Sequence, residues 1–159
     1  MSGAVVYVVA KAPWAGAVKT RLLPAVTPVE AAGLARAFLL DTLVLARRAR
    51  GVTVRAVCRD AVDATAIREL GRPSLDVLCQ REPGLGAALE ECFRHGLADG
   101  FGAVAVLGSD SPTLPPSVLE VARSSRSSAA APAKLNGTSS SMPASSSPIS
   151  SSVPGARVG

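Results

Sequence analysis

The sequence up to residue 122 alternates short apolar runs with amphipathic segments, and this alternation restricts the fold more than any other feature. Four apolar runs are predicted to be strands: Ala4–Ala10, Val52–Cys58, Leu75–Cys79 and Gly102–Gly108. Apolar residues recur at helical spacing in the segments that follow them, which are Pro28–Arg50, Ala61–Leu70, Leu85–Gly100 and a stretch that begins at Pro115. This alternation is typical of an α/β protein with a Rossmann-like, doubly wound parallel sheet.

Two of the predicted helices carry more specific signals. Thr27 suits the N-cap of the first helix and Pro28 suits its first turn. In the helix over Leu85–Gly100, the residues expected to face the core are Leu89, Cys92, Phe93 and Leu97. The single histidine, His95, falls on the polar side of that helix and is expected at the surface.

Polar residues follow three of the predicted strands. A basic loop, Lys11–Pro24, follows the first strand, Gln80 follows the third and Asp110 follows the fourth. Ligands of doubly wound sheets bind at the carboxyl ends of the strands. The three polar segments are therefore expected to converge on one edge of the sheet.

The basic loop reads "KAPWAGAVKTRLLP" and places Lys11, Lys19 and Arg21 around Gly16. Lysine offers phosphate a point charge, arginine offers a planar fork, and glycine allows close approach of the backbone. The alternative is a solvated loop that binds nothing. The spacing matches neither the Walker pattern GxxxxGK[ST] nor the pattern GxGxxG. Trp14 in the same loop either stacks on a base or covers the loop.

The segment "LGSDSPTLP" places Asp110 two residues beyond a predicted buried strand. A carboxylate at that position can bind Mg²⁺ or Mn²⁺ together with a substrate diphosphate, because hard cations use one or two carboxylates plus phosphate oxygens. The alternative is that Asp110 caps the next helix, a role that Ser111 or Thr113 could share.

The segment "QREPGLGAAL", Gln80–Leu89, places glycines before a predicted helix. The N-terminus of that helix could receive an anion or the edge of a base. A plain turn followed by a helix cap is an equally good interpretation.

The charge distribution argues against nucleic acid as a partner. The whole chain has a net charge of +5, but up to Ala122 it holds thirteen Lys and Arg against twelve Asp and Glu. No basic stripe with interleaved aromatic residues occurs, as nucleic-acid binding would require. No apolar run approaches the length of about 20 residues that a membrane-spanning helix needs, and the N-terminus reads as a strand and not as a signal peptide. The expected location is the cytoplasm.

The composition changes abruptly near Ala122. Thirteen serines follow that residue and five precede it, whereas all the Phe, Trp and Tyr residues precede it. A segment so poor in large apolar residues cannot offset the entropy lost on ordering. We therefore expect a nucleotide-binding α/β domain over residues 1–122 and a disordered tail, rich in Ser, Ala and Pro, over residues 123–159.

The three cysteines, Cys58, Cys79 and Cys92, form no CxxC pair, which argues against a zinc site or a redox motif. Cys58 and Cys79 each end an apolar run. They are interpreted as small hydrophobic residues of buried strands.

The segments "KAPWAGAVKTRLLP", "QREPGLGAAL" and "VLGSDSPTLP", in this order, resemble those of the bacterial glycosyltransferase-A-like proteins, over about Val5–Val121. That family is related to the molybdenum-cofactor nucleotidyltransferases and to 2-phospho-lactate guanylyltransferase. The resemblance implies a nucleotide-diphospho-sugar transferase (GT-A) fold and transferase activity.

The resemblance also implies roles for individual residues. Those that would hold the nucleotide phosphates are Lys11, Gly16, Lys19 and Arg21. Gln80 and Gly86 would border the nucleotide. Asp110 would bind Mg²⁺ or Mn²⁺ in place of the DxD motif of these enzymes.

The sequence departs from the family pattern in two places. Ala88 stands where the family usually has an arginine, so one anchoring contact is lost. After "SDSPTLP" and its helix, the family continues into a further strand and a "GPAxDGGYYLIG"-like segment on the acceptor side, which the Ser-rich tail replaces here. We therefore expect a domain truncated at its C-terminal side, with a tail that arose by frameshift or truncation; sequencing the locus tests this.

These observations favour a metal-dependent, glycosyltransferase-like protein that binds a nucleotide-activated sugar. A nucleotidyltransferase that takes a nucleoside triphosphate and releases pyrophosphate is the first alternative. An inactive, truncated nucleotide-binding module is the second. The sequence names no general base and specifies no catalytic residue, sugar, base, acceptor or oligomeric state.

Overall fold

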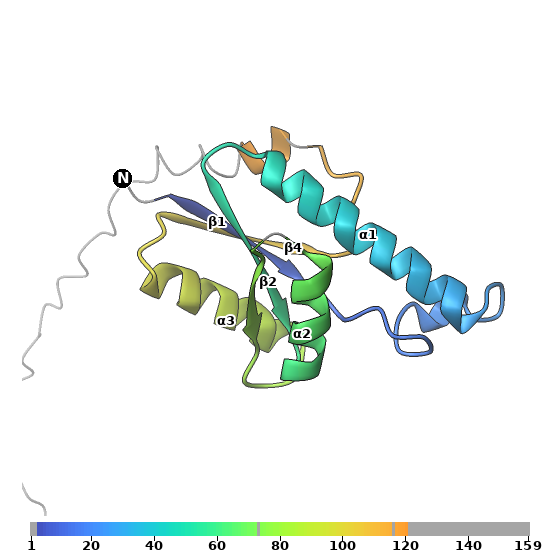
Figure 1. The fold of residues 1–159 in the computed structure, drawn as a ribbon. Coiled ribbons are helices and arrows are strands. Elements are labelled where there is room, and N and C mark those ends of the chain that lie inside the picture. The colour runs from blue at the N-terminus through green and yellow to red at the C-terminus, as the bar shows by residue number, and fades with distance from the viewer. Residues whose placement is uncertain (1–2, 73, 116, 121–159) are drawn as a thin grey trace, which may run out of the picture. The chain divides into compact units, whose positions relative to one another are not determined.

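The computed structural model describes residues 3–72, 74–115 and 117–120, all within one compact unit. The described part contains a sheet of four parallel strands in the order β3-β2-β1-β4. The strands are β1 (Ala4–Val9), β2 (Val52–Cys58), β3 (Asp76–Cys79) and β4 (Ala103–Gly108). The four predicted strands are thus confirmed to within one residue at each end, and the parallel α/β fold is confirmed (Figure 1).

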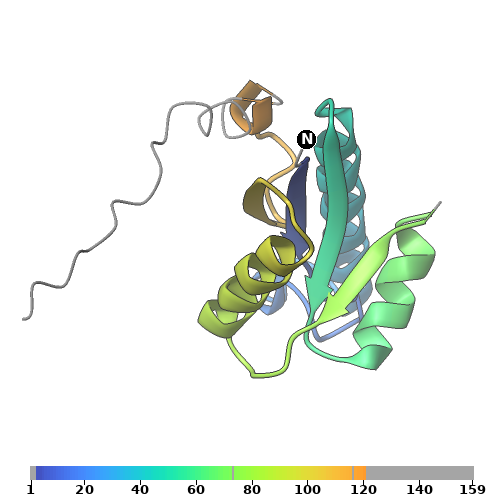
Figure 2. The ribbon, with the colours of Figure 1, turned by 90° about the vertical axis from the view of Figure 1, so that its left-hand side faces the viewer.

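Helices cover both faces of the sheet. Helices α1 (Pro28–Arg48) and α2 (Ala61–Leu70) lie on one face and α3 (Leu85–Ala98) lies on the other (Figure 2). Successive residues of a strand point to opposite faces. In β1, Val8 therefore packs with α1 and α2, whereas Val5 and Tyr7 pack with α3. Because both faces are covered, β1 needs the continuous apolar run that the sequence shows.

The N-terminus of α1 follows the prediction, whereas the helix ends at Arg48, two residues before the predicted end. The Thr27 side chain accepts a hydrogen bond from the Glu30 backbone N–H, and the Glu30 side chain accepts one from the Thr27 backbone N–H. This reciprocal pair is a capping box, which satisfies two backbone donors that the first turn leaves free. Helix α2 begins with a simple N-cap, because the Asp60 side chain accepts from the backbone N–H groups of Val62 and Asp63.

The order in which strands are added to the sheet changes direction at β1. The first two crossovers add β2 and β3 on one side of β1, and the third crossover, through α3, places β4 on the other side. The carboxyl ends lie level, since Val9 pairs with Val57 of β2 and with Gly108 of β4. Such a switch point is where doubly wound sheets bind ligands.

The predicted core face of α3 is wrong in part. Cys92 is buried as expected, but the side chains of Phe93 and Leu97 are 44% and 52% exposed. The buried residues of α3 are small or polar: Ala88, Glu91, Cys92 and Gly96. A Cβ atom on Gly96 would lie 2.7 Å from Val104 Cγ2, so the helix approaches the sheet too closely for large side chains on that face.

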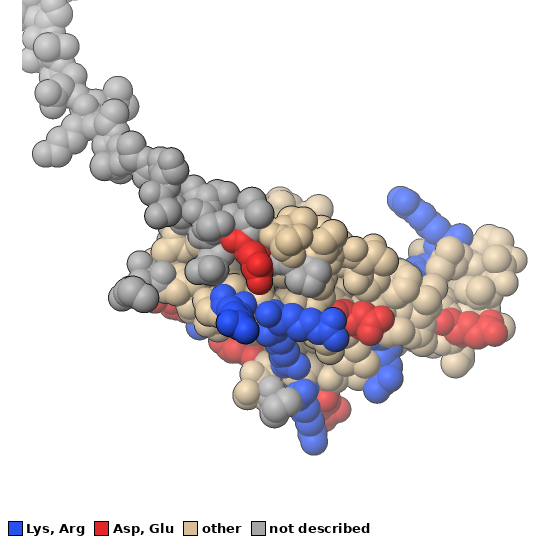
Figure 3. All heavy atoms as spheres, turned by 90° about the horizontal axis from the view of Figure 1, so that it is seen from above, with Lys and Arg blue, Asp and Glu red and all other residues tan. Residues whose placement is uncertain are grey.

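The surface over α1 carries both signs of charge. Figure 3 shows lysine and arginine side chains there beside aspartate and glutamate side chains.

Among the described residues, no helix is both long enough and apolar enough to cross a membrane. Residues 117–120 are helical, in the stretch predicted to start a helix at Pro115. The predictions for the tail, residues 123–159, fall outside the described residues.

Candidate functional site

A cleft of about 720 Å³ lies at the carboxyl ends of the strands. It is lined by residues that follow all four strands and by the first turn of α3. Five of the seven residues predicted for the site line it: Lys11, Lys19, Arg21, Gln80 and Asp110. The structure therefore brings together segments that are far apart in the sequence, as the topology predicted. The roles of these residues remain predictions.

The loop after β1 shapes one wall of the cleft. It turns at Gly16, whose φ of 79° is left-handed and therefore suits glycine. The short 3-10 helix η1 (Thr20–Leu22) follows, and it carries Arg21. Gly16 is not among the lining residues. Its position accounts for the course of the loop and not for a contact in the cleft.

Lys19 is the most constrained cation of the loop. Its Nζ atom lies 2.8 Å from Asp110 Oδ1, and it lies 4.4 Å from the centroid of the Phe38 ring on α1. The Lys19 side chain is 13% exposed, although its partner carboxylate is 70% exposed. Two of the three segments that resemble transferase motifs thus meet in an ion pair.

Asp110 is placed by the residue before it. The Ser109 backbone N–H donates to the Val9 carbonyl at 3.1 Å, which extends the β1–β4 pairing by one residue. The Ser109 carbonyl accepts from the hydroxyl of Thr42, a fully buried residue of α1, at 3.2 Å. The described helical residues that follow are 117–120, too far along the chain for Asp110 to be their N-cap. The alternative role for Asp110 as a helix cap is therefore wrong.

The N-terminus of α3 forms another part of the cleft wall. Its N-cap, Gly84, has a φ of 110°, and no side chain caps the helix. Gly84, Leu85 and Ala88 line the cleft, whereas Gly86, in the same turn, does not. Gln80 donates through Nε2 to the Glu82 carbonyl at 2.7 Å, which holds the turn that leads into the helix.

Arg59 is a lining residue that the sequence reasoning missed. It follows β2 directly, as Gln80 follows β3, so the same rule about strand ends would have found it. Its side chain is 62% exposed, and its Nε atom lies 3.0 Å from Asp60 Oδ2. A fourth cation therefore stands at the cleft.

The described residues fit a divalent cation only under one condition. They contain no group of three or more His, Cys, Asp and Glu side chains that could hold a metal ion. Asp110 is thus a single carboxylate donor. Mg²⁺ is commonly held by one or two carboxylates with the remaining oxygens from water and substrate phosphates. The donor set fits Mg²⁺ or Mn²⁺ when a phosphate ligand supplies further oxygens.

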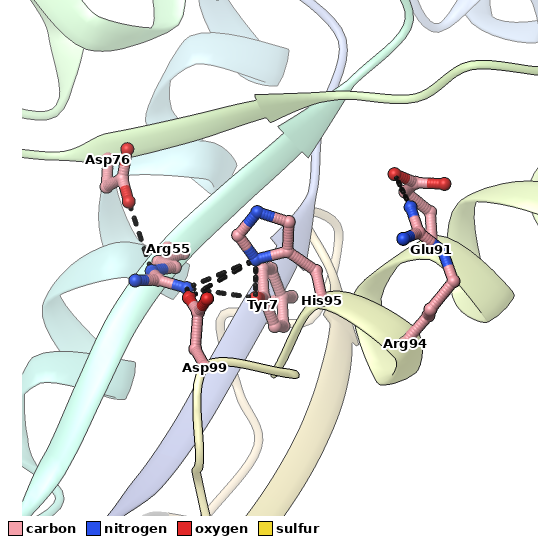
Figure 4. A network of polar contacts seen from close by, with 7 residues as sticks. All are labelled: Tyr7, Arg55, Asp76, Glu91, Arg94, His95 and Asp99. Carbon is pink, nitrogen blue, oxygen red and sulfur yellow. Dashed lines mark hydrogen bonds and ion pairs between the residues drawn. The ribbon is translucent and has the colours of Figure 1, made fainter. Parts of the chain in front are cut away.

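A second polar cluster lies between α3 and the sheet (Figure 4). Arg55 on β2 sits beside Tyr7 on β1 and Asp76 on β3. Its Nε atom is 3.1 Å from Asp76 Oδ2 without hydrogen-bond geometry, and its NH1 group donates to the Tyr7 hydroxyl and to Asp99. His95 was expected at the surface, and its side chain is 36% exposed. Its Nδ1 atom nevertheless lies 3.3 Å from the Tyr7 hydroxyl, a partner that the sequence did not suggest.

This cluster serves packing and is separate from the cleft. His95 and Asp99 lie at the C-terminal end of α3, whereas the cleft is at its N-terminal end. Burial raises the pKa of Tyr7, and the hydrogen bond from Arg55 lowers the pKa of Asp99. The cluster thereby gives hydrogen-bond partners to the Tyr7 hydroxyl and the Arg55 guanidinium, which lie between α3 and the sheet.

The remaining candidates from the sequence take structural positions. Trp14 donates through Nε1 to Asp63 of α2 at 3.1 Å and lines a second, smaller hollow, so it ties the basic loop to α2. Cys58 and Cys92 are buried. Burial raises the pKa of each of these two thiols to about 12, which fits their interpretation as core residues.

Comparison with known proteins agrees with this fold. A model of the bacterial family described as "Uncharacterized protein conserved in bacteria (DUF2064)" matches residues 42–132. The chain is also similar to a solved structure from Desulfovibrio desulfuricans G20, described as that of a proposed nucleotide-diphospho-sugar transferase, with 27% sequence identity and a TM-score of 0.70. The match covers 77% of this chain and 54% of the other, so the chain spans about half of that protein. No curated protein sequence matches significantly.

Proposed function

The chain belongs to the bacterial family DUF2064. From its cleft and from its similarity to a solved structure described as a nucleotide-diphospho-sugar transferase, we propose that it is a metal-dependent transferase that takes a nucleotide-activated sugar. The observation that carries the proposal is the convergence of four cations and one exposed carboxylate on a single cleft at the switch point of the sheet. The cations are Lys11, Lys19, Arg21 and Arg59, and the carboxylate is Asp110.

This arrangement suits a ligand with two phosphates. Lysine and arginine neutralise phosphate oxygens with charge-assisted hydrogen bonds. The uncapped backbone N–H groups at the start of α3 add partial positive charge at the same cleft. A carboxylate alone would repel a phosphate. Asp110 therefore fits a site in which the carboxylate and the phosphate oxygens coordinate the same cation.

The chain's own residues would perform three tasks in the transfer. Lys11, Arg21 and Arg59 would bind the diphosphate and fix its orientation. Asp110 would hold Mg²⁺ or Mn²⁺, which neutralises the charge that develops on the leaving diphosphate. The Thr42–Ser109 hydrogen bond would keep Asp110 at its position beside β1.

The same cleft would serve a nucleotidyltransferase, because a nucleoside triphosphate also leaves a diphosphate group at the metal. The products distinguish the two activities. Release of a nucleoside diphosphate indicates sugar transfer, and release of pyrophosphate indicates nucleotidyl transfer.

The proposal is tested by thermal unfolding with a panel of nucleotide sugars and nucleoside triphosphates, each with and without Mn²⁺. A ligand that binds only the folded state at 100 times its Kd adds about 2.7 kcal/mol, which raises the midpoint by several degrees. The shift should require Mn²⁺ and should disappear in Asp110→Ala. The matched control is Asp41→Ala, an exposed carboxylate on α1 outside the cleft. A chain that shows no shift with any member of the panel would contradict the proposal.

A further inference from the structure

We propose that Lys19 occupies the cation position of Asp110, so that the protein takes a divalent cation only when a phosphate ligand draws Lys19 away. This inference rests on the proposed function, since it concerns the order of binding at the same site. It assigns Lys19 a task that Lys11 and Arg21 do not share, although all three come from one loop.

The contacts of Lys19 show that its ammonium group is held in place. Asp110 Oδ1 lies 2.8 Å from Nζ, and the Phe38 ring lies 4.4 Å below it. A cation over an aromatic face is attracted by the ring quadrupole, and a shielded side chain loses less of this attraction to water. The Lys19 side chain is 13% exposed. An ordinary surface ion pair has neither of these supports.

The backbone of Lys19 supports the same conclusion. Its φ of 48° and ψ of 37° are left-handed, which costs energy for a residue with a Cβ atom. Asn, Asp and Gly adopt this conformation more readily than lysine does. Strained conformations persist where the surrounding contacts impose them. The left-handed backbone of Lys19 is therefore consistent with a side chain that its contacts with Asp110 and Phe38 hold in place.

The charge balance makes metal binding conditional. Without a ligand, the carboxylate of Asp110 is already neutralised by Lys19, and the described residues offer no cluster of three donors to compensate a divalent ion. A divalent ion at Asp110 would stand within a few ångströms of the ammonium group, and the two would repel each other. A diphosphate removes the conflict, because its oxygens accept Lys19 and also coordinate the ion.

Two equilibria are therefore coupled through one side chain. A phosphate ligand should increase the affinity for Mn²⁺, and by linkage Mn²⁺ should increase the affinity for that ligand by the same factor. Removal of the Lys19 charge should uncouple them. Lys19→Met keeps an apolar stem over Phe38 and leaves Asp110 without its counter-ion, so Mn²⁺ should bind without any phosphate.

Equilibrium dialysis of Mn²⁺ against the full chain measures this directly. The two conditions are Mn²⁺ alone and Mn²⁺ with inorganic pyrophosphate, which carries the diphosphate chemistry without a base. Wild type should bind Mn²⁺ weakly alone and on the order of tenfold more tightly with pyrophosphate. Lys19→Met should bind Mn²⁺ alone on the order of tenfold more tightly than wild type, the effect of one unit charge a few ångströms away.

The matched control is Arg36→Met, which removes one positive charge from an exposed position of α1 outside the cleft and should bind Mn²⁺ as wild type does. Equal Mn²⁺ binding by wild type and Lys19→Met without pyrophosphate would overturn the inference. If Lys19→Met does not fold, Lys19→Gln undergoes the same measurement. The measurement with Mn²⁺ alone contains no nucleotide. A higher Mn²⁺ affinity of Lys19→Met would therefore support this inference even if the thermal-unfolding panel contradicted the proposed function.

Discussion

Replacement of Gly96 by alanine tests the close approach of α3 to the sheet. The new Cβ atom would lie 2.7 Å from Val104 Cγ2 and 3.1 Å from Val5 Cγ1. Val5 is fully buried and valine is stiff at χ1, so α3 must move or Val104 must change its rotamer. Such overpacking costs about 2 kcal/mol, of which the better helix propensity of alanine recovers about 1 kcal/mol. We expect a net loss of about 1 kcal/mol in the free energy of unfolding.

Gly33 provides the matched control for this experiment. It lies within α1 in an exposed position, and a Cβ atom there would meet nothing within 4 Å. Gly33→Ala should therefore stabilise the protein by up to about 1 kcal/mol, through helix propensity alone. Urea unfolding followed by circular dichroism measures both variants, with midpoints that move in opposite directions. If Gly96→Ala stabilises the protein as much as Gly33→Ala does, the close packing of α3 on β4 is wrong.

Three further predictions concern a helix cap, a titrating carboxylate and the cleft. Thr27→Ala removes one half of the capping box and should lower the free energy of unfolding by about 1 kcal/mol in the same urea assay. Because the hydrogen bond from Arg55 lowers the pKa of Asp99 below its ordinary value of 3.8, the folded state gains stability above that value and loses it as the pH falls through the lowered pKa. In Asp99→Asn, unfolding measured between pH 2 and pH 6 should show a smaller loss on acidification; an unchanged pH profile would contradict this role. Arg59→Ala should weaken nucleotide binding by about threefold to tenfold in calorimetry while the thermal midpoint without ligand stays the same.

The strands and their convergence could be predicted because both depend on local pattern and on topology. Continuous apolar runs such as Ala4–Val9 indicate a strand covered on both faces, and the predicted parallel arrangement, which the structure confirms, brings the carboxyl ends of the strands to one edge. The position of Arg59 was predictable by the same rule. What the topology provides is proximity; the chemical roles of Lys11, Arg21 and Gln80 remain predictions.

The orientation of α3 was not predictable from its own sequence. Its large apolar residues, Phe93 and Leu97, suggest an inward face by periodicity, but the distance between helix and sheet is set by Gly96 and by the residues it meets on β1 and β4. The partners of His95 are equally remote, since Tyr7 lies 88 positions away and Arg55 lies 40 positions away. Contacts of this kind depend on packing between elements and have no local signal.

The parallel sheet also has a consequence for how the protein folds. Residue 4 of β1 pairs with residue 103 of β4, and Lys19 and Asp110 are 91 positions apart. Pairings this distant must first close a long loop, which makes them slow to form. During synthesis, Lys19 leaves the ribosome well before Asp110 does, so it lacks this counter-ion until the later segment has been made. The cleft exists only after β4 has docked on β1, so the ability to bind a ligand should appear late in folding, after the β1–β2–β3 part has formed.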